Sequence, residues 1–420
     1  MERSAKHVTK LYHRPRHESA PMRKINIRDF QVARQSTSRD VNRQILLNLL
    51  RAHQPVSRAD LARLMKTTRG VVGALVNELI ADGLIYDGPT RAASRGRKPT
   101  LLYVRTRDRL VVAADVRVSA IDIALCDFAG EQIALESFPP ILSPDEFIRE
   151  FPKHVSALLK KHKGTEHCEG IGIVVPGMAD RQAGRVISAP LLGWRDVEIG
   201  PPVAKSTGLP VVVESAGKAC ALAHMWLTHD DAMNTQDFIY ITVSDGVGTG
   251  LVVDGRLVSG HGGTAGEFGH MALSLDGPRC ACGSNGCWMA YISDRATSSR
   301  YASYLKSKTP ARDPSLRTVI SLARSGNVKA MAALQTTARY LGLGLVNILH
   351  GVDPACVYIG GEITTAWDIV EPEMREAIVE RALTEKIASA VILPSKISDP
   401  RLRGAVALIA APTFAAPKVA

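Results

Sequence analysis

One histidine and three cysteines stand close together in the second half of the sequence, in the pattern H-x9-C-x-C-x4-C. The four residues, His270, Cys280, Cys282 and Cys287, lie within eighteen positions. One imidazole and three thiolates fill the tetrahedral shell that zinc prefers in structural sites, and they leave no position for a reactive water. The spacing therefore predicts a structural zinc ion bound within residues 267–289.

The rest of the composition favours a cytoplasmic protein. The other four of the seven cysteines are scattered, which favours buried thiols over a disulfide framework. No uncharged apolar run reaches the roughly 18 residues of a membrane span, and the basic N-terminus lacks the apolar stretch of a signal peptide. We therefore expect two or three globular domains in 420 residues and no membrane partner.

The positive charge is concentrated at one end of the chain. Residues 1–105 hold 21 Lys and Arg against 8 Asp and Glu, whereas the remaining residues hold 31 against 33. A basic excess confined to one segment is typical of proteins whose partner carries phosphates. Residues 1–40 show no sustained apolar period, and we expect them to form a basic, disordered tail.

The apolar pattern of residues 41–105 predicts three helices followed by a β-hairpin. The first helix ends near Ala52, and Ser57 is placed to cap a short second helix. Thr68 caps a third helix with an apolar inner face, and two short strands are expected at 84–86 and 101–104. This order predicts a winged helix-turn-helix that binds double-stranded DNA.

Two parts of this domain carry side chains suited to DNA. The third helix, which would lie in the major groove, presents Thr68, Arg69, Val71 and Asn77. The loop between the strands presents Arg95, Gly96, Arg97 and Lys98, a slim basic segment suited to a narrow minor groove. One short helix makes few base contacts, so we expect a homodimer or homotetramer that reads two half-sites.

The remainder of the chain, 106–420, alternates predicted strands with predicted helices, which favours an α/β body with mixed sheets. Strand-like runs include 110–115, 171–175, 238–243 and 357–359, and the longest helical pattern covers 330–349. Two glycine-rich segments, 245–250 and 360–361, are interpreted as loops that phosphates or nucleosides can approach. Tight turns use the same residues, so each segment alone carries little weight.

Several motifs of this body resemble the ROK family of repressors and kinases. The resemblance rests on Gly-Thr-Ala-Gly-Glu-Phe-Gly-His at 263–270 with the three clustered cysteines, and it continues at Pro176-Gly177, Gly193-Trp194 and Gly360-Gly361. It implies an actin-like (ribonuclease H-like) fold of two lobes, with a cleft that holds a sugar and ATP in the kinases. Together with the helix-turn-helix, it implies the repressor branch of the family.

The resemblance also implies that sugar phosphorylation is absent. The family carries an Asn-Asp pair, whose aspartate is the general base, where this sequence has Ser215 and Ala216. A methyl group accepts no proton. The first phosphate loop reads Asp115-Val116-Arg117 instead of Asp-x-Gly, and Asp245 replaces a threonine of the second. We therefore expect no catalytic residues; these substitutions disfavour ATP binding, and the sequence leaves open whether any nucleotide binding persists.

The sugar ligands implied by the family are only partly present. Glu267 and His270 remain, whereas Leu191, Ser215, Ala216 and Met289 stand at the other positions. A buried site for hydroxyl groups needs polar partners. The expected effector is a less hydroxylated molecule, a sugar held differently, or none.

Taken together, the sequence predicts a sequence-specific transcriptional regulator, a repressor, and not an enzyme. Two alternatives remain at this stage. One is a ROK sugar kinase with an added DNA-binding domain, and the other is a regulator that a protein partner controls without a small effector.

Overall fold

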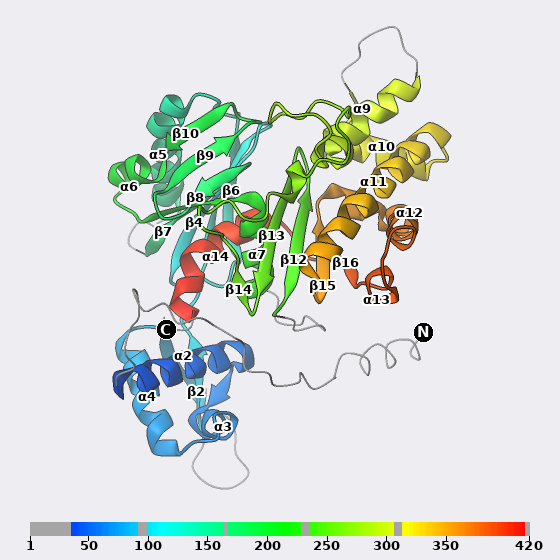
Figure 1. Cartoon of the computed structure of the whole chain (residues 1–420). Helices are drawn as coiled ribbons and strands as arrows, with labels where there is room; N and C mark the ends of the chain where they lie inside the picture. The colour runs from blue at the N-terminus through cyan, green and yellow to red at the C-terminus, as the bar shows by residue number, and fades with distance from the viewer. Residues whose placement is uncertain (1–34, 91–98, 163–166, 228–235, 306–312, 416–420) are drawn as a thin grey trace. The chain divides into compact units, whose positions relative to one another are not determined.

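The computed structural model describes residues 35–90, 99–162, 167–227, 236–305 and 313–415. The chain divides into two compact units (Figure 1). Of the described residues, the N-terminal unit holds 35–82, 88–90, 99–102 and Ala415, and the body holds 83–87 and those between 103 and 414. No helix in the described ranges is both long enough and apolar enough to cross a bilayer.

In its described residues, the N-terminal unit has three helices and a small sheet with the strand order β1-β3-β2. Its elements are α2 (Gln35–His53), β1 (Val56–Ser57), α3 (Arg58–Leu64), α4 (Arg69–Ala81), the second half of β2 (Ile85–Thr90) and the first three residues of β3 (Thr100–Val104). The other residues of these two strands belong to the body. One apolar side of each helix is buried, including Leu46 of α2, Leu61 of α3 and Val76 of α4. The spacing of apolar residues thus builds a small core of its own.

Local signals fix where these helices begin. Ser57 caps α3 in a capping box with Asp60, and the Thr68 hydroxyl accepts a hydrogen bond from the Val71 amide at the start of α4. Both predicted caps are therefore present. The predicted start of the first helix is wrong, because α2 begins at Gln35 rather than near Val41, so that 35–40 are helical and not part of a tail.

Each lobe of the body contains a five-stranded sheet, and the two sheets share one topology. Three antiparallel strands form a meander, a fourth strand pairs in parallel with the first strand of the meander, and a fifth pairs in parallel with the fourth. The first lobe has β4 (Leu110–Val116), β5 (Ile121–Asp127), β6 (Gln132–Phe138), β7 (Cys168–Val175) and β11 (Val211–Ser215). The second has β12 (Phe238–Val243), β13 (Val247–Val253), β14 (Arg256–Leu257), β15 (Cys356–Gly360) and β16 (Ile392–Pro394).

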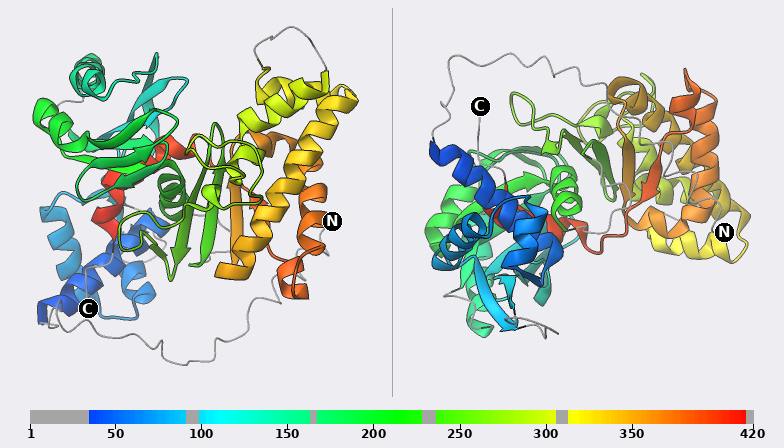
Figure 2. Two further views of the ribbon diagram at one scale, coloured as in Figure 1. Left: turned by 45° about the horizontal axis from the view of Figure 1, so that its top comes forward. Right: turned by 90° about the horizontal axis from the view of Figure 1, so that it is seen from below.

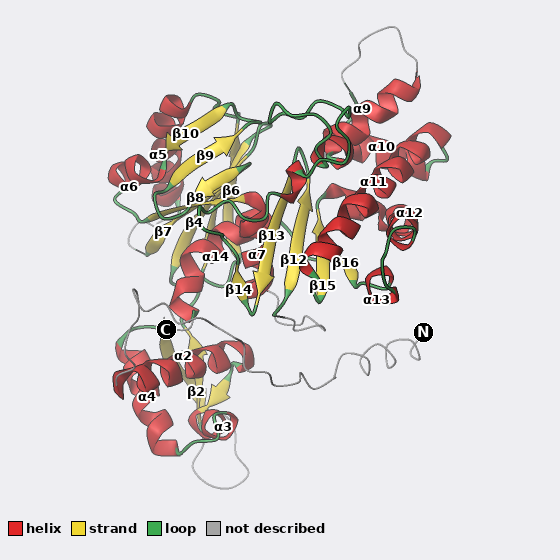
Figure 3. Cartoon of the chain, viewed as in Figure 1, coloured by secondary structure: helices red, strands yellow, loops and turns green. Residues whose placement is uncertain are grey.

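Helices cover the outer face of each sheet (Figure 3). In the first lobe α5 (Pro144–Lys161) and α6 (Gly200–Thr207) join a core that includes Phe147, and a small sheet of β8 (Met178–Asp180), β9 (Arg185–Ala189) and β10 (Trp194–Glu198) completes it. The second lobe has its core under helices that follow the cysteine cluster. These are α8 (Met289–Ile292), α9 (Asp294–Leu305), α10 (Leu316–Arg324), α11 (Val328–Val352), α12 (Trp367–Val379) and α13 (Glu385–Ala388), with the short turns η1 (Phe268–His270) and η2 (Glu362–Ala366).

Two helices, α7 (Ala216–Leu227) and α14 (Pro400–Phe414), lie between the sheets (Figures 1 and 2). Glycines allow close approach here: a Cβ at Gly172 of β7 would lie 2.0 Å from the Ala405 carbonyl oxygen of α14, and one at Gly404 would lie 2.3 Å from that of Ala219 in α7. The lobes are therefore joined through tightly packed backbones.

The fold agrees with the predicted mixed α/β body, and it corrects one expectation about its loops. The segment 245–250 was expected to be an open glycine-rich loop, yet β13 begins at Val247 and pairs with β12 from that residue onward. Only the tight turn at 244–246 remains outside the strands. The glycines at 248 and 250 instead pack against α7, where a side chain would collide with Gly217 or Ala221.

Candidate functional site

The structure brings together the four residues predicted to bind metal. His270 ends the turn η1, Cys280 and Cys282 lie in the following loop, and Cys287 precedes α8. The Cys280 Sγ lies 3.7 Å from the His270 Nδ1, the Cys282 and Cys287 Sγ atoms are 3.7 Å apart, and all four donor atoms lie within 4.8 Å of one another. Zinc with tetrahedral bonds of about 2.3 Å requires sulfur atoms about 3.8 Å apart. The donor set therefore fits zinc.

The loop that carries these ligands is fixed by its own backbone. The Cys280 amide donates to the Ser284 carbonyl at 2.8 Å, and short β-bridges join Arg279 to Asn285 and Ala272 to Cys287. Burial lowers the pKa of His270, which favours the neutral imidazole that coordinates metals. Burial raises the pKa of the Cys287 thiol to about 12, so a nearby cation is needed to form its thiolate at neutral pH.

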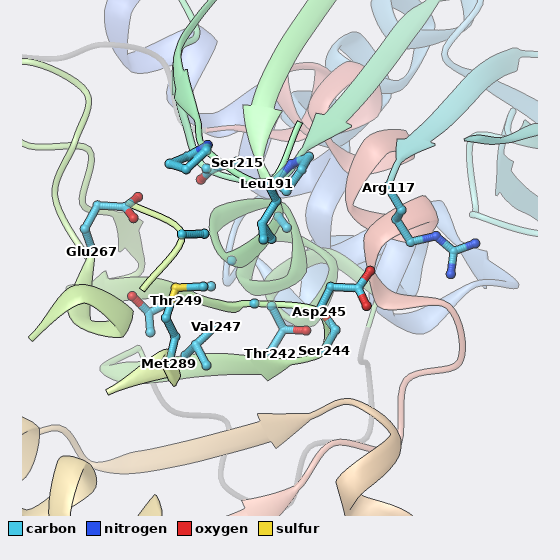
Figure 4. Close-up of a pocket in the computed structure, with 18 of the residues that line it drawn as sticks. Arg117, Leu191, Ser215, Thr242, Ser244, Asp245, Val247, Thr249, Glu267 and Met289 are labelled. Carbon is cyan, nitrogen blue, oxygen red and sulfur yellow. The ribbon is translucent and has the colours of Figure 1, made fainter. Parts of the chain in front are cut away.

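A cleft adjoins this cluster and is lined by both residues expected to bind an effector, Glu267 and His270. Figure 4 shows Glu267 among the residues that line it. Its walls come from the ends of β4, β7 and β11 in the first lobe, and from the β12–β13 turn and the cysteine segment in the second. The space between these walls, including its opening to solvent, measures about 730 Å³. Since His270 Nδ1 faces the thiols, Nε2 is the nitrogen left for a ligand.

The substituted family positions line the same cleft. Leu191, Ser215, Ala216 and Met289 all contribute to its wall. The Ala216 methyl, at the position of the kinases' general base, is itself buried. Ser215 Oγ stands 3.3 Å from the Glu214 Oε1, and its amide donates to the same oxygen at 2.8 Å. Ser215 thereby holds the carboxylate of Glu214, which is buried.

A buried lysine, Lys218 of α7, was not found by the analysis of the sequence. Its side chain is only 2% exposed and its ammonium donates to the carbonyl of Gly263, in the loop that leads to Glu267. Burial raises the pKa values of Glu214 and Glu267, and the charge of Lys218 opposes the rise in both. The one signal in the sequence was a charged residue in a helix that otherwise begins with small apolar ones.

A different group of carboxylates lies behind the opposite end of the cleft. Asp245 lines the cleft, and Asp294 and Glu362 lie close enough to interact with one another through their charges. Burial first, and then the charges of Asp245 and Glu362, raise the pKa of Asp294 to about 7. The carboxylate of Glu362 pairs with the exposed Arg317. This end of the cleft is unfavourable for the phosphates of a nucleotide.

Asp115, the aspartate of the altered phosphate loop, is engaged by two arginines. Its Oδ1 lies 2.6 Å from the Arg401 Nε of α14, and its Oδ2 lies 3.4 Å from the Arg117 Nε. Arg117 also pairs with Asp122, and both arginines line the cleft. A carboxylate neutralised in this way is not available to hold a metal–phosphate complex.

On the N-terminal unit, the residues predicted to contact DNA share the solvent-exposed face of α4. Thr68, Arg69, Val71 and Asn77 are exposed, and Val71 is 43% exposed although it is apolar. The acidic residues Glu78 and Asp82 pair with Arg39 and Arg43 of α2. The predicted loop residues Arg95, Gly96, Arg97 and Lys98 lie outside the described residues.

Two lobes of shared topology around a cleft define the class of actin-like, sugar-kinase-type folds. The chain belongs to the ROK family, whose model matches residues 111–411.

Relatives of two kinds are similar to this chain. The xylose repressor of Bacillus subtilis (strain 168) is 29% identical over 381 residues, covering 88% of this chain and 94% of the repressor. A glucokinase of Streptomyces coelicolor is 28% identical over 281 residues, covering 64% of this chain and 86% of the kinase. A ROK family transcriptional regulator, a homolog of the E. coli MLC protein, matches the structure with a TM-score of 0.77 at 24% identity, covering 90% of this chain and 97% of the other.

Proposed function

We propose that the protein is a sequence-specific DNA-binding transcriptional repressor. The observation that carries the proposal is the extent of the similarity. An alignment of 381 residues to a repressor does not fit within the ROK-matched body and must include much of the N-terminal unit, whereas the similarity to a glucokinase spans 281 residues. The N-terminal unit is thus what this chain shares with repressors beyond the family body. Such a regulator acts in the cytoplasm, where its operator lies.

In this proposal, 41–105 with the start of α2 form a winged helix-turn-helix, and α4 is the recognition helix. Pairing of Glu78 and Asp82 with α2 removes negative charge from that helix and leaves Arg69 to approach DNA. Arg69 is suited to guanine, and the exposed Val71 to a thymine methyl. Asn77 and the loop residues Arg95 to Lys98 add contacts further along the duplex.

The test begins with selection of bound fragments from genomic DNA, followed by fluorescence anisotropy on the selected duplex. Arg69→Ala should reduce discrimination against a changed base pair by about 1–3 kcal/mol. Arg149→Ala is the matched control, because Arg149 is an exposed arginine on α5 of the body. Affinity for the duplex should fall steeply as salt is raised.

The contradicting results are distinct. If the full-length protein binds no duplex at low salt, the proposal fails. If Arg69→Ala weakens binding equally on every sequence, Arg69 contacts phosphates and the recognition face is assigned wrongly. Light scattering on the free protein and on its complex tests the homodimer or homotetramer that two half-sites require.

The proposal includes a structural zinc ion held by His270, Cys280, Cys282 and Cys287. The donor distances and the neutral imidazole support it. When bound, zinc supplies the positive charge that stabilises the thiolates. The chain itself orients the imidazole, so that His270 is held at the wall of the cleft. Elemental analysis of protein purified without a histidine tag should give one zinc per chain.

The cleft is proposed to bind a sugar-like effector through Glu267 and His270 without transferring a phosphoryl group. The buried methyl of Ala216, the pairing of Asp115 and the carboxylates around Asp245 support this. A coupled ATP assay with D-xylose, D-glucose and N-acetylglucosamine should give no sugar-dependent turnover. Ala216→Asp alone should also stay inactive, because the phosphate end would remain acidic. Turnover by the unmodified protein would instead identify a kinase.

A further inference from the structure

A groove beside the cysteine cluster contains an unusual concentration of arginine and tyrosine. It runs along α9 and is lined by Arg279, Arg295, Arg300, Tyr291, Tyr304 and Tyr340, among others. Its empty space is about 1530 Å³, about twice that of the cleft. The groove borders the metal cluster through Cys280, but its arginines and tyrosines belong neither to that cluster nor to the expected effector residues. The groove therefore requires an explanation of its own.

The guanidinium groups in the groove are of two kinds. Arg300 is fixed, because it donates to the Tyr291 carbonyl at 2.8 Å and to the Thr337 hydroxyl, and it lies 5.7 Å from the ring centre of Tyr340. Arg279 and Arg295 are exposed, and no acidic partner pairs with either in the described part of the chain. Two arginines are thus free to form charge-assisted hydrogen bonds with an anion.

The surface around these arginines is largely aromatic and hydroxyl-bearing, and Ser299, which lines it, donates to the exposed carboxylate of Asp313. Tyr291 and Tyr340 pack with ring centres 4.3 Å apart, which fixes the floor of the groove. The Arg279 backbone is held by its bridge to Asn285. Asp245 is the single acidic residue among those that line the groove, so its net charge is positive.

The groove is continuous with the cleft. Leu191, Asp245, Ala281 and Met289 line both. A ligand with one unit against Glu267 and His270 can therefore extend past Met289 into the groove. A neutral monosaccharide in the cleft would not use the arginines.

We infer that Arg279 and Arg295 bind the anionic group, a carboxylate or a phosphate, of a ligand whose sugar unit lies in the cleft. The inference rests on the proposed function in one respect, namely that the cleft binds a sugar-like effector. Aromatic faces pack the apolar side of the ligand, and the guanidiniums select its charge. Uronate-containing oligosaccharides and sugar phosphates share this chemistry.

The experiment measures binding by calorimetry at low ionic strength with four probes. Digalacturonate and cellobiose compare a charged disaccharide with a neutral one, and glucose 6-phosphate and glucose make the same comparison for phosphate. At least one anionic probe should bind roughly tenfold or more tightly than its neutral partner, since charge-assisted hydrogen bonds are strong. A preference for digalacturonate over cellobiose identifies a carboxylate as the anionic group. A preference for glucose 6-phosphate over glucose identifies a phosphate. Added salt should reduce the advantage.

The double variant Arg279→Ala/Arg295→Ala should lose that preference and keep the weaker binding of the neutral probe. Arg195→Ala is the control, because Arg195 is an exposed arginine without an ion pair in the described residues and lies on β10, outside the groove. Thermal unfolding of all variants checks that the fold is intact.

Three results would overturn the inference: no binding of either anionic probe at millimolar concentration, equal affinity for charged and neutral probes, or a preference that survives the double variant. DNA binding is measured on the same preparations and should be unchanged in the double variant. A protein that binds the anionic probes through these arginines but ignores DNA would refute the proposed repressor function alone.

Discussion

The buried carboxylates at the two ends of the cleft have neighbours of opposite charge. At one end, the ammonium of Lys218 opposes the cost of burying Glu214 and Glu267. At the other, Asp294 is raised in pKa by burial and by two further carboxylates, Asp245 and Glu362. A charged side chain removed from water needs an opposite charge or a proton. The end with Lys218 therefore keeps its carboxylates in place as hydrogen-bond acceptors. The end with Asp245 and Asp294 disfavours the binding of phosphates.

Under the proposed function, this difference separates binding from catalysis within one fold. Glu267 and His270 remain positioned at the end that would receive a sugar, and His270 is anchored to the cysteine cluster. The end where a kinase holds phosphates has its Asp115 neutralised by arginines. A cleft of this kind can recognise a ligand and change the relation of its lobes, which is what an effector-controlled regulator requires.

Removal of the proposed zinc ion should cause the largest loss of stability. It also acts at one end of the cleft only, the end where His270 lies. Chelation, or Cys280→Ser with Cys287→Ser, should lower the free energy of unfolding by several kcal/mol, since metal binding contributes directly to folding. Differential scanning calorimetry with and without chelator measures the loss. Cys168→Ser is the control, because Cys168 is a half-buried cysteine of β7 outside the cluster. Unchanged melting together with the absence of bound metal would disprove the zinc site.

Replacement of Lys218 should have the next largest effect. Lys218→Met removes the ammonium whose charge acts on both buried carboxylates, Glu214 and Glu267, and leaves Arg181 acting on Glu214. Because loss of one partner of a buried charge pair costs about 3–5 kcal/mol, we expect a loss of stability of up to that size. Urea unfolding measures the change. Lys205→Met is the matched control, because Lys205 is an exposed lysine on α6.

A double variant distinguishes charge from packing at this site. If the cost is electrostatic, adding Glu267→Gln to Lys218→Met should restore part of the lost stability. If Lys218→Met is as stable as Lys205→Met, the ammonium does not balance the two carboxylates and the contrast between the two ends is incorrect.

The features that sequence analysis found are those that neighbouring residues determine. The caps Ser57 and Thr68 and the cysteine spacing act over a few positions, and the structure contains all three. Most of the central strands were also expected, because parallel strands buried on both faces are continuous apolar runs.

The features that were missed depend on contacts between distant segments. Lys218 gains its role only when α7 meets the loop at Gly263, and Asp294 gains its raised pKa only beside Asp245 and Glu362. The strands β8 to β10 are short and half-exposed, so their apolar pattern is weak. The start of α2 was missed because polar residues open the helix, and its ion pairs reach α4 some forty positions away.

The smallest expected effect is the dependence of stability on pH that Asp294 causes. Its pKa is about 7 in the folded protein against its usual 3.8, so the folded state keeps a proton that the unfolded chain has already lost. Protonation of Asp294 therefore favours the folded state. This contribution to the free energy of unfolding is fully present below pH 4 and is lost as the pH rises to about 7. Asp294→Asn should remove this loss and be more stable than the natural protein at pH 8 by on the order of 1–3 kcal/mol. Urea unfolding at pH 5 and pH 8 measures this difference in stability, with Asp276→Asn, at an exposed aspartate, as control.

Equal pH dependence in the natural protein and in Asp294→Asn would contradict the contrast between the two ends. It would show that the carboxylates around Asp294 are as well compensated by positive charge as those around Lys218.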